Sequence, residues 1–600
     1  MKHYILSGMA LLALMIASCS EDNLDIPQKG VVSYESFYSD PNNAENAVAY
    51  VYQAGMFSHW CGLGYQTSDP WIWQGAVYNL QEAPSDDVYW ASEHKGDHVE
   101  GLQLNEFNQN FTYNSAAPTV VYPAMYNMIR PSNLLLDNYK YNMVSGDSIL
   151  NNTVNRAISE AKVSRAYAHF FLATYWNNPP LVDHQLPGDA KPGNTPHDEI
   201  IDWCIAELEE AIPYLPSKSG LEDPNMVVRF SKEFAYALKG KIEVFAGKYK
   251  EAKESLKKVI DSGLYDLVDG QDMHKIYHAE GDCSKEWLFQ YNFIDNESLG
   301  CDPKGVIFAY GASGHFSPHF VKSTSWRNLR AYPDEVDNAG WGSINPSKSF
   351  GDALIANDGM DSWRRQSWIV TYDEMLNGKV IGTDTVLTIS AKKTMDKRGI
   401  NKDGVFGCVG YWQYKRLPLN KEQVVKAQNT QVGGTEAVSE VNYPIMRYAE
   451  VLLLYAEACA IYGDADGSGF AALKKVQERA GSKHVSERLS LEEVKNEKRF
   501  ECFLEGTRFA DLVRWGDAPE VLGEQGKRVP TAFDKMCCPI GTKVEDGTVT
   551  ENTTEHVLAI QWNEYNTEYG FKAGKHEYMP YPFSVISVND NIEQNPGWEQ

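Results

Sequence analysis

Residues 497–516 read EKRFECFLEGTRFADLVRWG, and this stretch carries the strongest structural signal in the chain. Charged side chains recur through it at helical spacing, at Lys498, Glu501, Glu505, Arg508, Asp511 and Arg514. Neighbours three positions apart carry opposite charges, so they can pair along one face of a helix. We therefore predict a continuous helix over 497–516 that is braced by ion pairs. The same acids could instead serve as acid/base catalysts.

Outward from this stretch, apolar residues at helical spacing predict antiparallel helix pairs. The 163–171 segment places its aromatic residues on one helical face, and a partner helix is expected over 197–212. A tighter pair fits into about 34 residues, with Ser231 as the cap of its first helix and a turn near Gly247. This plan is typical of tetratricopeptide repeats, whose pairs bury their apolar faces only by stacking on one another.

These segments predict a mainly α fold, in which tetratricopeptide-like helix pairs form a right-handed superhelical scaffold with long irregular loops and a few short strands. One domain is expected over 41–600, with the scaffold at about 41–56, 121–263 and 444–516 and the loops at about 59–118 and 265–442. Loops of this length inside a compact chain are usually functional or disordered, and the many tryptophans within 265–442 favour an ordered segment.

The N-terminus has the pattern of a lipoprotein leader. Residues 1–18 contain one lysine and the apolar run Met9–Ala17, which is too short to span a bilayer stably. The run closes on Ile16-Ala17-Ser18-Cys19, the pattern of a bacterial lipobox. We predict a signal peptide over 1–18, acylation of Cys19, and a tether and N-terminal segment over 19–40. An ordinary secreted protein with a coincidental cysteine is the alternative.

The composition excludes some partners. The formal net charge is −26 and the pI is near 5.0, whereas nucleic-acid binding requires basic patches over the phosphates.

The ten cysteines contain no C-x-x-C pair. Residues 464–469 resemble the start of a calcium loop, but Lys475 stands where a bidentate glutamate is needed, so we expect a helix–helix turn there. No cofactor is predicted, and structural calcium elsewhere stays open.

Several motifs together resemble the SusD/RagB family of nutrient-binding lipoproteins. The 497–516 run is similar to the family's pattern E-R-R-x-E-L-x-x-E-G-x-R-x-x-D-L-x-R-W-G, and the segment Arg447–Ala458 resembles its signature helix. The ending Gln594–Trp598 and the helices around Glu160 and over 234–267 match the family as well. The acidic step after Cys19, Ser20–Asn23, resembles the export tag of surface lipoproteins in Bacteroidetes-type bacteria.

The resemblance implies a non-catalytic, lipid-anchored protein on the outer face of the outer membrane. Such proteins capture oligosaccharides and load them into a SusC/RagA-type TonB-dependent transporter. The charged residues of 497–516 are accordingly interpreted as structural ion pairs. Two alternatives stay open, namely capture of peptides, as in RagB-like branches, and a lipid-anchored glycoside hydrolase.

Aromatic residues in the predicted loops are the candidates for ligand contact. Sugars stack their C–H faces on flat rings, while polar side chains orient the hydroxyl groups. The predicted glycan-binding residues are Trp71, Trp73, Tyr89, Trp90, Trp326, Arg327 and Trp341. Core packing is the alternative for each ring. The step Ser85-Asp86-Asp87 resembles a common family motif, and we expect its acids to brace the loop.

Overall fold

The computed structural model describes residues 33–61, 76–90, 95, 99–220, 228–292, 344–377, 404–416, 423–429, 434–439 and 441–598. Helices dominate this part of the chain, and the predicted mainly α fold is confirmed. None of the described helices is long and apolar enough to cross a membrane.

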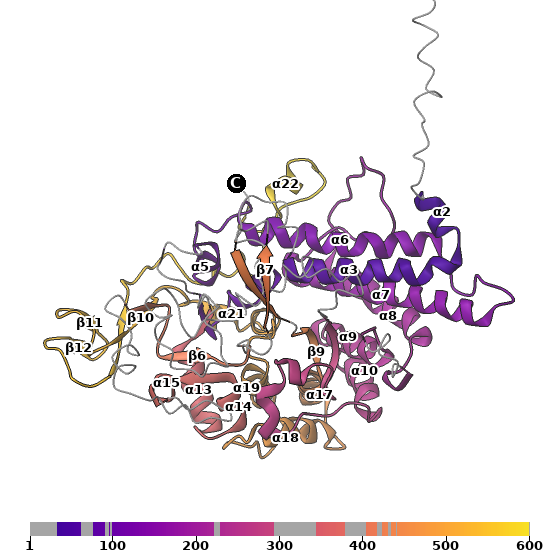
Figure 1. Cartoon of the computed structure of the whole chain (residues 1–600). Coiled ribbons are helices and arrows are strands. Elements are labelled where there is room, and N and C mark those ends of the chain that lie inside the picture. Colours follow the sequence, from indigo (N-terminus) through magenta and orange to yellow (C-terminus); the bar gives the residue numbers. More distant parts are fainter. Residues whose placement is uncertain are drawn as a thin grey trace, which may run out of the picture.

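The scaffold is a stack of antiparallel helices (Figure 1). Its members are α3 (Ala44–Cys61), α6 (Ala116–Asn138), α7 (Ser148–Trp176), α8 (His197–Ala211), α9 (Lys232–Phe245), α10 (Tyr249–Asp261), α17 (Tyr448–Tyr462) and α18 (Ser468–Ala480). Consecutive helices pack on each other, and α10 also packs on α17, which joins the early pairs to the late one. The three predicted helix pairs are therefore confirmed.

The α9–α10 pair shows how local sequence sets this geometry. Ser231 caps α9, because its hydroxyl accepts a hydrogen bond from the Phe234 amide at 3.1 Å. Gly247 turns the chain with a positive φ of 69°. Where the helices meet, a Cβ at Gly240 would lie 2.5 Å from Leu256 Cγ, so glycine permits their close approach.

Short helices connect the scaffold to the rest of the molecule. They are α2 (Tyr34–Tyr38), α4 (Ala76–Glu82), α5 (Val99–Asn105), α13 (Lys348–Asp358), α14 (Trp363–Trp368), α15 (Tyr372–Asn377), α21 (Ala518–Leu522) and α22 (Phe583–Ile586). Several of them lie inside the ranges predicted as loops. They escaped the sequence analysis because one to three helical turns give too few apolar positions to establish a period.

The strands are short, and their pairings are antiparallel. The pairs are β1 (Val88–Trp90) with β3 (Ile344–Pro346), β2 (Trp287–Tyr291) with β9 (Tyr443–Arg447), β4 (Ile369–Thr371) with β6 (Tyr411–Gln413), β7 (Gln423–Asn429) with β8 (Gly434–Ser439) and β11 (Lys543–Val544) with β12 (Gly547–Thr548). A three-stranded sheet has the order β13 (Leu558–Trp562), β10 (Pro530–Asp534), β5 (Val405–Phe406). The β11–β12 hairpin lies at the end of the molecule opposite α2 (Figure 1).

The prediction of one continuous helix over 497–516 is wrong. The chain forms α19 (Leu491–Glu501) and α20 (Arg508–Trp515), separated by a turn in which Leu504 and Gly506 have positive φ values of 57° and 73°. Because the two helices fold back on each other, Lys498 pairs with Asp511 at 2.9 Å rather than with Glu501. Of the predicted pairs along the helix, Asp511–Arg514 is present, at 2.8 Å.

A buried cluster of charges lies where α19 meets the other segments. Arg447 is fully buried, and its Nη1 lies 2.6 Å from both Glu286 Oε1 and Glu501 Oε1. Arg364, also fully buried, lies 3.1 Å from Glu501 Oε2 and 2.7 Å from Asp358 Oδ1. Burial alone would raise the pKa of Glu501, but Arg479, Arg447 and Arg364 hold it well below its usual range. The expectation of a structural ion-pair network is confirmed.

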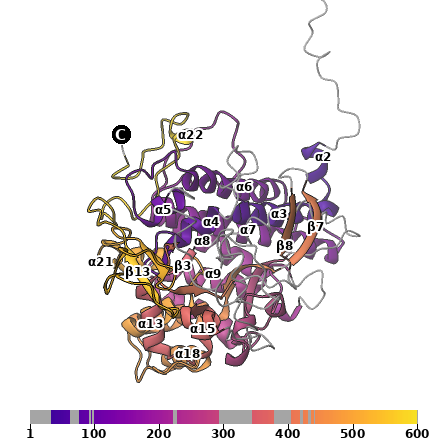
Figure 2. The ribbon, with the colours of Figure 1, turned by 60° about the vertical axis from the view of Figure 1, so that its left-hand side comes forward.

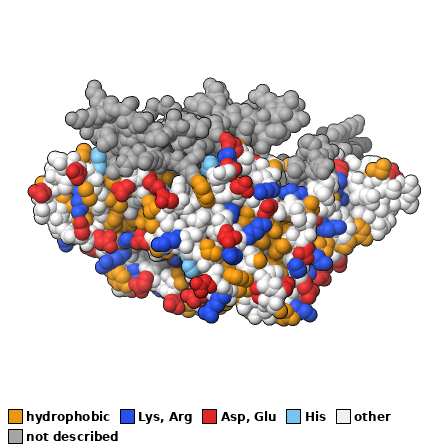
Figure 3. Space-filling model, turned by 90° about the horizontal axis from the view of Figure 1, so that it is seen from below, with side chains coloured by type: hydrophobic (Ala, Val, Ile, Leu, Met, Phe, Trp, Pro, Cys, Tyr) orange, Lys and Arg blue, Asp and Glu red, His pale blue; other side chains and the backbone are white. Residues whose placement is uncertain are grey.

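The surface seen from below, on the side of α18, mixes acidic and basic side chains with scattered apolar ones (Figure 3). The described part of this face is therefore not suited to attract ligands of one charge sign from a distance. On α10, Lys257 and Asp261 form an exposed ion pair, and exposed pairs stabilise a fold little.

Replacing Arg447 by methionine is expected to destabilise the protein by about 3–5 kcal/mol, because Glu286, Glu501 and Glu505 would each lose a buried cation. The matched control is Lys257→Met, which removes an exposed cation and should cost less than about 1 kcal/mol. Thermal and denaturant unfolding of the soluble form beginning after Asp22 would measure both. Similar losses for the two variants would contradict the structural role of the cluster.

Candidate functional site

The β1–β3 ribbon joins parts of the chain that adjoin, in sequence, the two segments predicted to bind ligand. Residues 71–90 end in β1, and the second segment, 325–341, ends three residues before β3 begins. The pairing is antiparallel, with Tyr89 opposite Asn345 and Trp90 opposite Ile344. Positions about 250 residues apart in the chain are thus joined by backbone hydrogen bonds.

A carboxylate clamp fixes the start of this ribbon to the paired helices α19 and α20. Arg508 Nε lies 2.8 Å from Asp86 Oδ1, while Arg499 contacts both Asp86 Oδ2 at 2.9 Å and Asp87 Oδ1 at 2.6 Å. Burial raises the pKa of Asp87, whereas at Asp86 the effect of Arg508 and Arg499 outweighs burial and lowers the pKa. The expectation that these acids brace the loop is confirmed, and their ion pairs explain them without a catalytic role.

Further hydrogen bonds hold the ribbon together next to this clamp. The backbone amide of Ser347 donates to the Asp87 carbonyl at 2.8 Å, and its hydroxyl donates to the Asp86 carbonyl at 2.6 Å. Asn105 is buried, and its side-chain amide donates to the carbonyls of Ala83 at 2.6 Å and Val88 at 3.2 Å. The sequence analysis missed Asn105, because a lone asparagine near a helix end carries no signal of such a distant partner.

The turn between α19 and α20 is tied to α4 by one buried carboxyl group. The Gly506 amide donates a hydrogen bond to Glu82 Oε1. Burial raises the pKa of Glu82 to about 8, so this group is largely protonated at neutral pH. The clamp and this contact together hold both ends of residues 82–87 against the same helix pair.

Among the predicted ligand residues, Tyr89 is half-buried beside the ribbon. Its ring meets the half-buried Trp562 of β13 edge to face, with centroids 6.2 Å apart. Burial raises the pKa of the Tyr89 hydroxyl. Figure 2 shows β3 and β13 in the same part of the molecule, so two aromatic residues from distant segments lie together there. Trp562 was not predicted, because the pairing depends on tertiary structure alone.

The prediction that Trp90 contacts ligand is wrong, because its side chain is buried. Its side chain is 1% exposed, belongs to the main hydrophobic core and packs against Gly101, where a Cβ would overlap the indole ring. A ring with so little exposed surface cannot stack on a ligand. Trp71, Trp73, Trp326, Arg327 and Trp341 lie outside the described residues, as does Cys19.

The remaining candidate motifs have structural explanations. Asp464 accepts hydrogen bonds from the amides of Gly469 at 2.7 Å and Phe470 at 2.9 Å, so the calcium-like stretch is the expected turn between α17 and α18. In the described ranges, no group of three or more acidic, histidine or cysteine side chains is arranged to hold a metal ion. The cysteines described there, including the adjacent Cys537 and Cys538, have free thiols.

Substituting Arg499 by methionine is expected to loosen the ribbon while leaving the scaffold intact, because the clamp is lost on the Asp87 side. Hydrogen exchange should speed up in peptides covering 85–90 and 344–350 and stay unchanged in α7. The control is Arg488→Met, an exposed arginine for which the described residues offer no ion pair. Equal exchange in the two variants would show that Arg499 does not hold the ribbon.

Comparisons with known proteins agree with this architecture. A family model described as "SusD family" matches residues 304–598, and one described as "Starch-binding associating with outer membrane" matches residues 73–243. SusD-like protein P2 of Formosa agariphila is 24% identical over 556 residues, covering 89% of this chain and 95% of that protein.

Solved structures show the same fold over nearly the whole chain. A SusD-like carbohydrate binding protein from Bacteroides fragilis NCTC 9343 superposes with a TM-score of 0.65 at 21% identity, covering 93% of this chain and all of that one. Surface glycan-binding protein A from Bacteroides thetaiotaomicron, solved in complex with laminarihexaose, gives a TM-score of 0.62 at 18% identity, covering 92% and 99%. From its family matches and its fold, this chain is a member of the SusD/RagB family.

Proposed function

We propose that the chain is a non-catalytic, cell-surface lipoprotein that captures oligosaccharides and delivers them to a SusC-like TonB-dependent transporter. The observation that carries this proposal is the β1–β3 ribbon, which pairs Val88–Trp90, at the end of the first aromatic-rich segment, with Ile344–Pro346, shortly after the second. Relatives of this fold include proteins whose names state laminarin or glycan binding, and one was solved with laminarihexaose. A neutral glucan is a natural first ligand to test.

Chain connectivity supports a shared binding face. Trp73 precedes the start of α4 by three residues, and Trp341 precedes Ile344 by three residues. A fully extended chain spans at most about 3.6 Å per residue, so each Cα lies within about 11 Å of a described element. The Cα of Trp341 is therefore within that distance of β3, the strand that pairs with the β1 residue Tyr89. Rings presented there would give sugar faces an apolar surface at little entropy cost.

The N-terminus supplies the proposed anchor. Cys19 would carry acyl chains, and two or more chains together hold a protein stably in a membrane. The fourteen positions from Cys19 to Ser33, where description of the chain begins, would connect the anchor to α2 at one end of the helix stack. In this proposal the helix pairs would be available for the transporter, and the ligand would bind near β3 and β13, on the side of the view opposite α2 (Figure 2).

We expect that Trp71→Ala and Trp326→Ala each weaken oligosaccharide binding at least tenfold without changing the melting temperature, because a stacked ring contributes about 1.5 kcal/mol or more. Titration calorimetry with a panel of neutral oligosaccharides, including laminarihexaose, would measure this. Trp363→Ala is the control, since that indole is 41% exposed on α14. Unchanged affinity in both loop variants would reject the proposed site. Tight binding of peptides alone, or release of shortened products from a polysaccharide, would favour the alternatives.

Lipid anchoring predicts that Cys19→Ser moves the protein from the membrane fraction to the soluble fraction, because the acylated thiol is lost. Fractionation with immunoblotting would show the shift, and surface proteolysis of intact cells would test outward exposure of the wild type. The conservative control is Ser20→Ala, next to the predicted acylation site. Full retention of the Cys19→Ser protein in membranes would disprove lipidation at this position.

A further inference from the structure

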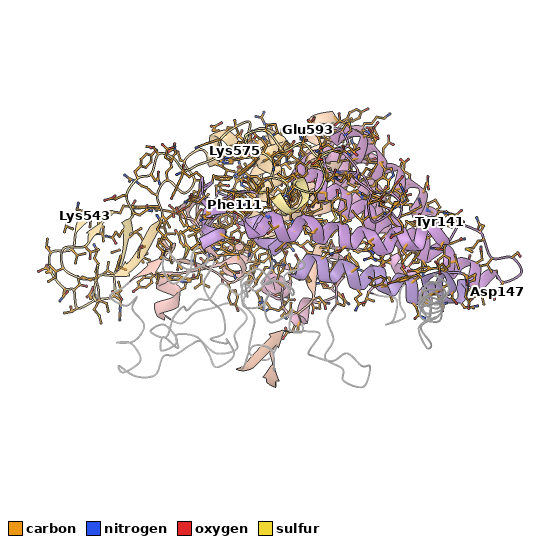
Figure 4. All side chains as sticks on the ribbon, turned by 90° about the horizontal axis from the view of Figure 1, so that it is seen from above. Phe111, Tyr141, Asp147, Lys543, Lys575 and Glu593 are labelled. Atoms are coloured by element: carbon orange, nitrogen blue, oxygen red, sulfur yellow. The ribbon has the colours of Figure 1, made fainter. Side chains whose placement is uncertain are left out.

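A cleft of about 670 Å³ opens beside the β1–β3 ribbon, and neither Tyr89 nor Trp90 is among its described lining residues. Its walls come from α13, the start of α15, the β6 region, the β11–β12 turn and β13. The volume is in the range of small-molecule binding sites, which run from about 300 to 1,000 Å³. It lies toward the end of the molecule marked by Lys543 in Figure 4, since Glu545 on its rim is two residues away.

The floor of the cleft is apolar and is held rigidly. Leu558 and Ile560 of β13 line it together with Val409. The half-buried ring of Tyr411 packs against Gly351 of α13, where a Cβ would overlap it, and its hydroxyl donates to Asp352 Oδ1 at 2.6 Å. The ring therefore has a fixed orientation and offers a surface on which an apolar face can stack.

The rim carries carboxylates, and ion pairs already occupy some of them. Glu374 receives two hydrogen bonds from Arg365, at 2.6 and 2.7 Å, and Asp546 pairs with Lys535 at 2.6 Å. Asp373 and Glu545 are exposed, and the described residues provide no ion pair for either of them. These two carboxylates keep their lone pairs available as hydrogen-bond acceptors.

The cationic side chain among the described lining residues is also engaged. Lys348 lines the cleft, but its ammonium group pairs with Asp352 at 2.8 Å. The rim therefore carries more negative than positive charge, which disfavours uronic acids and sulfated sugars. Hydroxyl groups of a neutral sugar can instead donate to Asp373 and Glu545.

From this geometry we propose that the cleft is a second saccharide-binding site for a neutral sugar unit. The inference rests on the proposed function for the class of its ligand. The apolar floor and the Tyr411 ring would contact the C–H faces, while the two carboxylates would fix the hydroxyl groups. The cleft adjoins the ribbon through Lys348, whose backbone amide hydrogen-bonds the Tyr89 hydroxyl. A branched or long glycan could thus contact both sites.

Native mass spectrometry with a panel of neutral trisaccharides, laminaritriose among them, tests this proposal on the soluble form beginning after Asp22. Wild-type protein should take up two copies of a bound trisaccharide. The double variant Asp373→Ala/Glu545→Ala should take up one, with the affinity at the second site reduced at least tenfold, because a hydrogen bond to a charged group contributes about 1.5 kcal/mol or more. The matched control Glu551→Ala/Glu555→Ala removes two exposed carboxylates outside the cleft lining and should still take up two.

A second cleft variant tests whether the loss of binding in the double variant is indirect. Leu558→Trp is expected to fill the cleft and to abolish the same binding event, while Trp71→Ala/Trp326→Ala should abolish the other. If the wild-type protein binds one trisaccharide and the cleft variants still bind one, the second site is rejected while the proposed function stands. Failure of wild-type protein to bind any trisaccharide of the panel, or any longer glycan, would reject the proposed function and the cleft with it.

Discussion

The fold depends on buried arginines, each of which needs several carboxylate partners in place in the native structure. Arg447 lies at the end of β9, and its partners Glu286, Glu501 and Glu505 come from two other regions of the chain. A buried guanidinium with a missing partner is strongly unfavourable, so the cluster tolerates few alternative arrangements of these segments. This constraint explains why a charged, poorly hydrophobic stretch such as 497–516 occupies the centre of the molecule.

The same helix pair extends this order to the β1–β3 ribbon. The α19–α20 turn is fixed internally by Lys498 and Asp511, and externally it holds Glu82 and the clamp carboxylates Asp86 and Asp87. The clamp in turn sets the register of β1 on β3. A rigid scaffold therefore extends as far as the ribbon, from which the predicted ligand segments depart. When the elements that carry a binding site are already ordered, little binding free energy is lost in ordering them.

Sequence reasoning succeeded where the signal is local. The helix pairs follow from apolar spacing, and the Ser231 cap follows from residue type. It failed where one residue decides the outcome, as when Gly506 turns a helical pattern back on itself. Trp90 and Tyr89 are adjacent and equally aromatic, yet one is core and the other half-exposed, because a strand sends neighbouring side chains to opposite faces. Trp562 and Asn105 could not be predicted, because their roles depend on contacts far away in the sequence.

The central proposal is that a saccharide binds beside the β1–β3 ribbon, where rings of the two aromatic-rich segments would contact it. A crystal structure of the soluble protein with a bound neutral oligosaccharide tests it most directly. The account predicts sugar density within contact distance of residues from both segments, beside Tyr89 and the ribbon. Sugar density confined to the helix pairs, far from the ribbon, would contradict it.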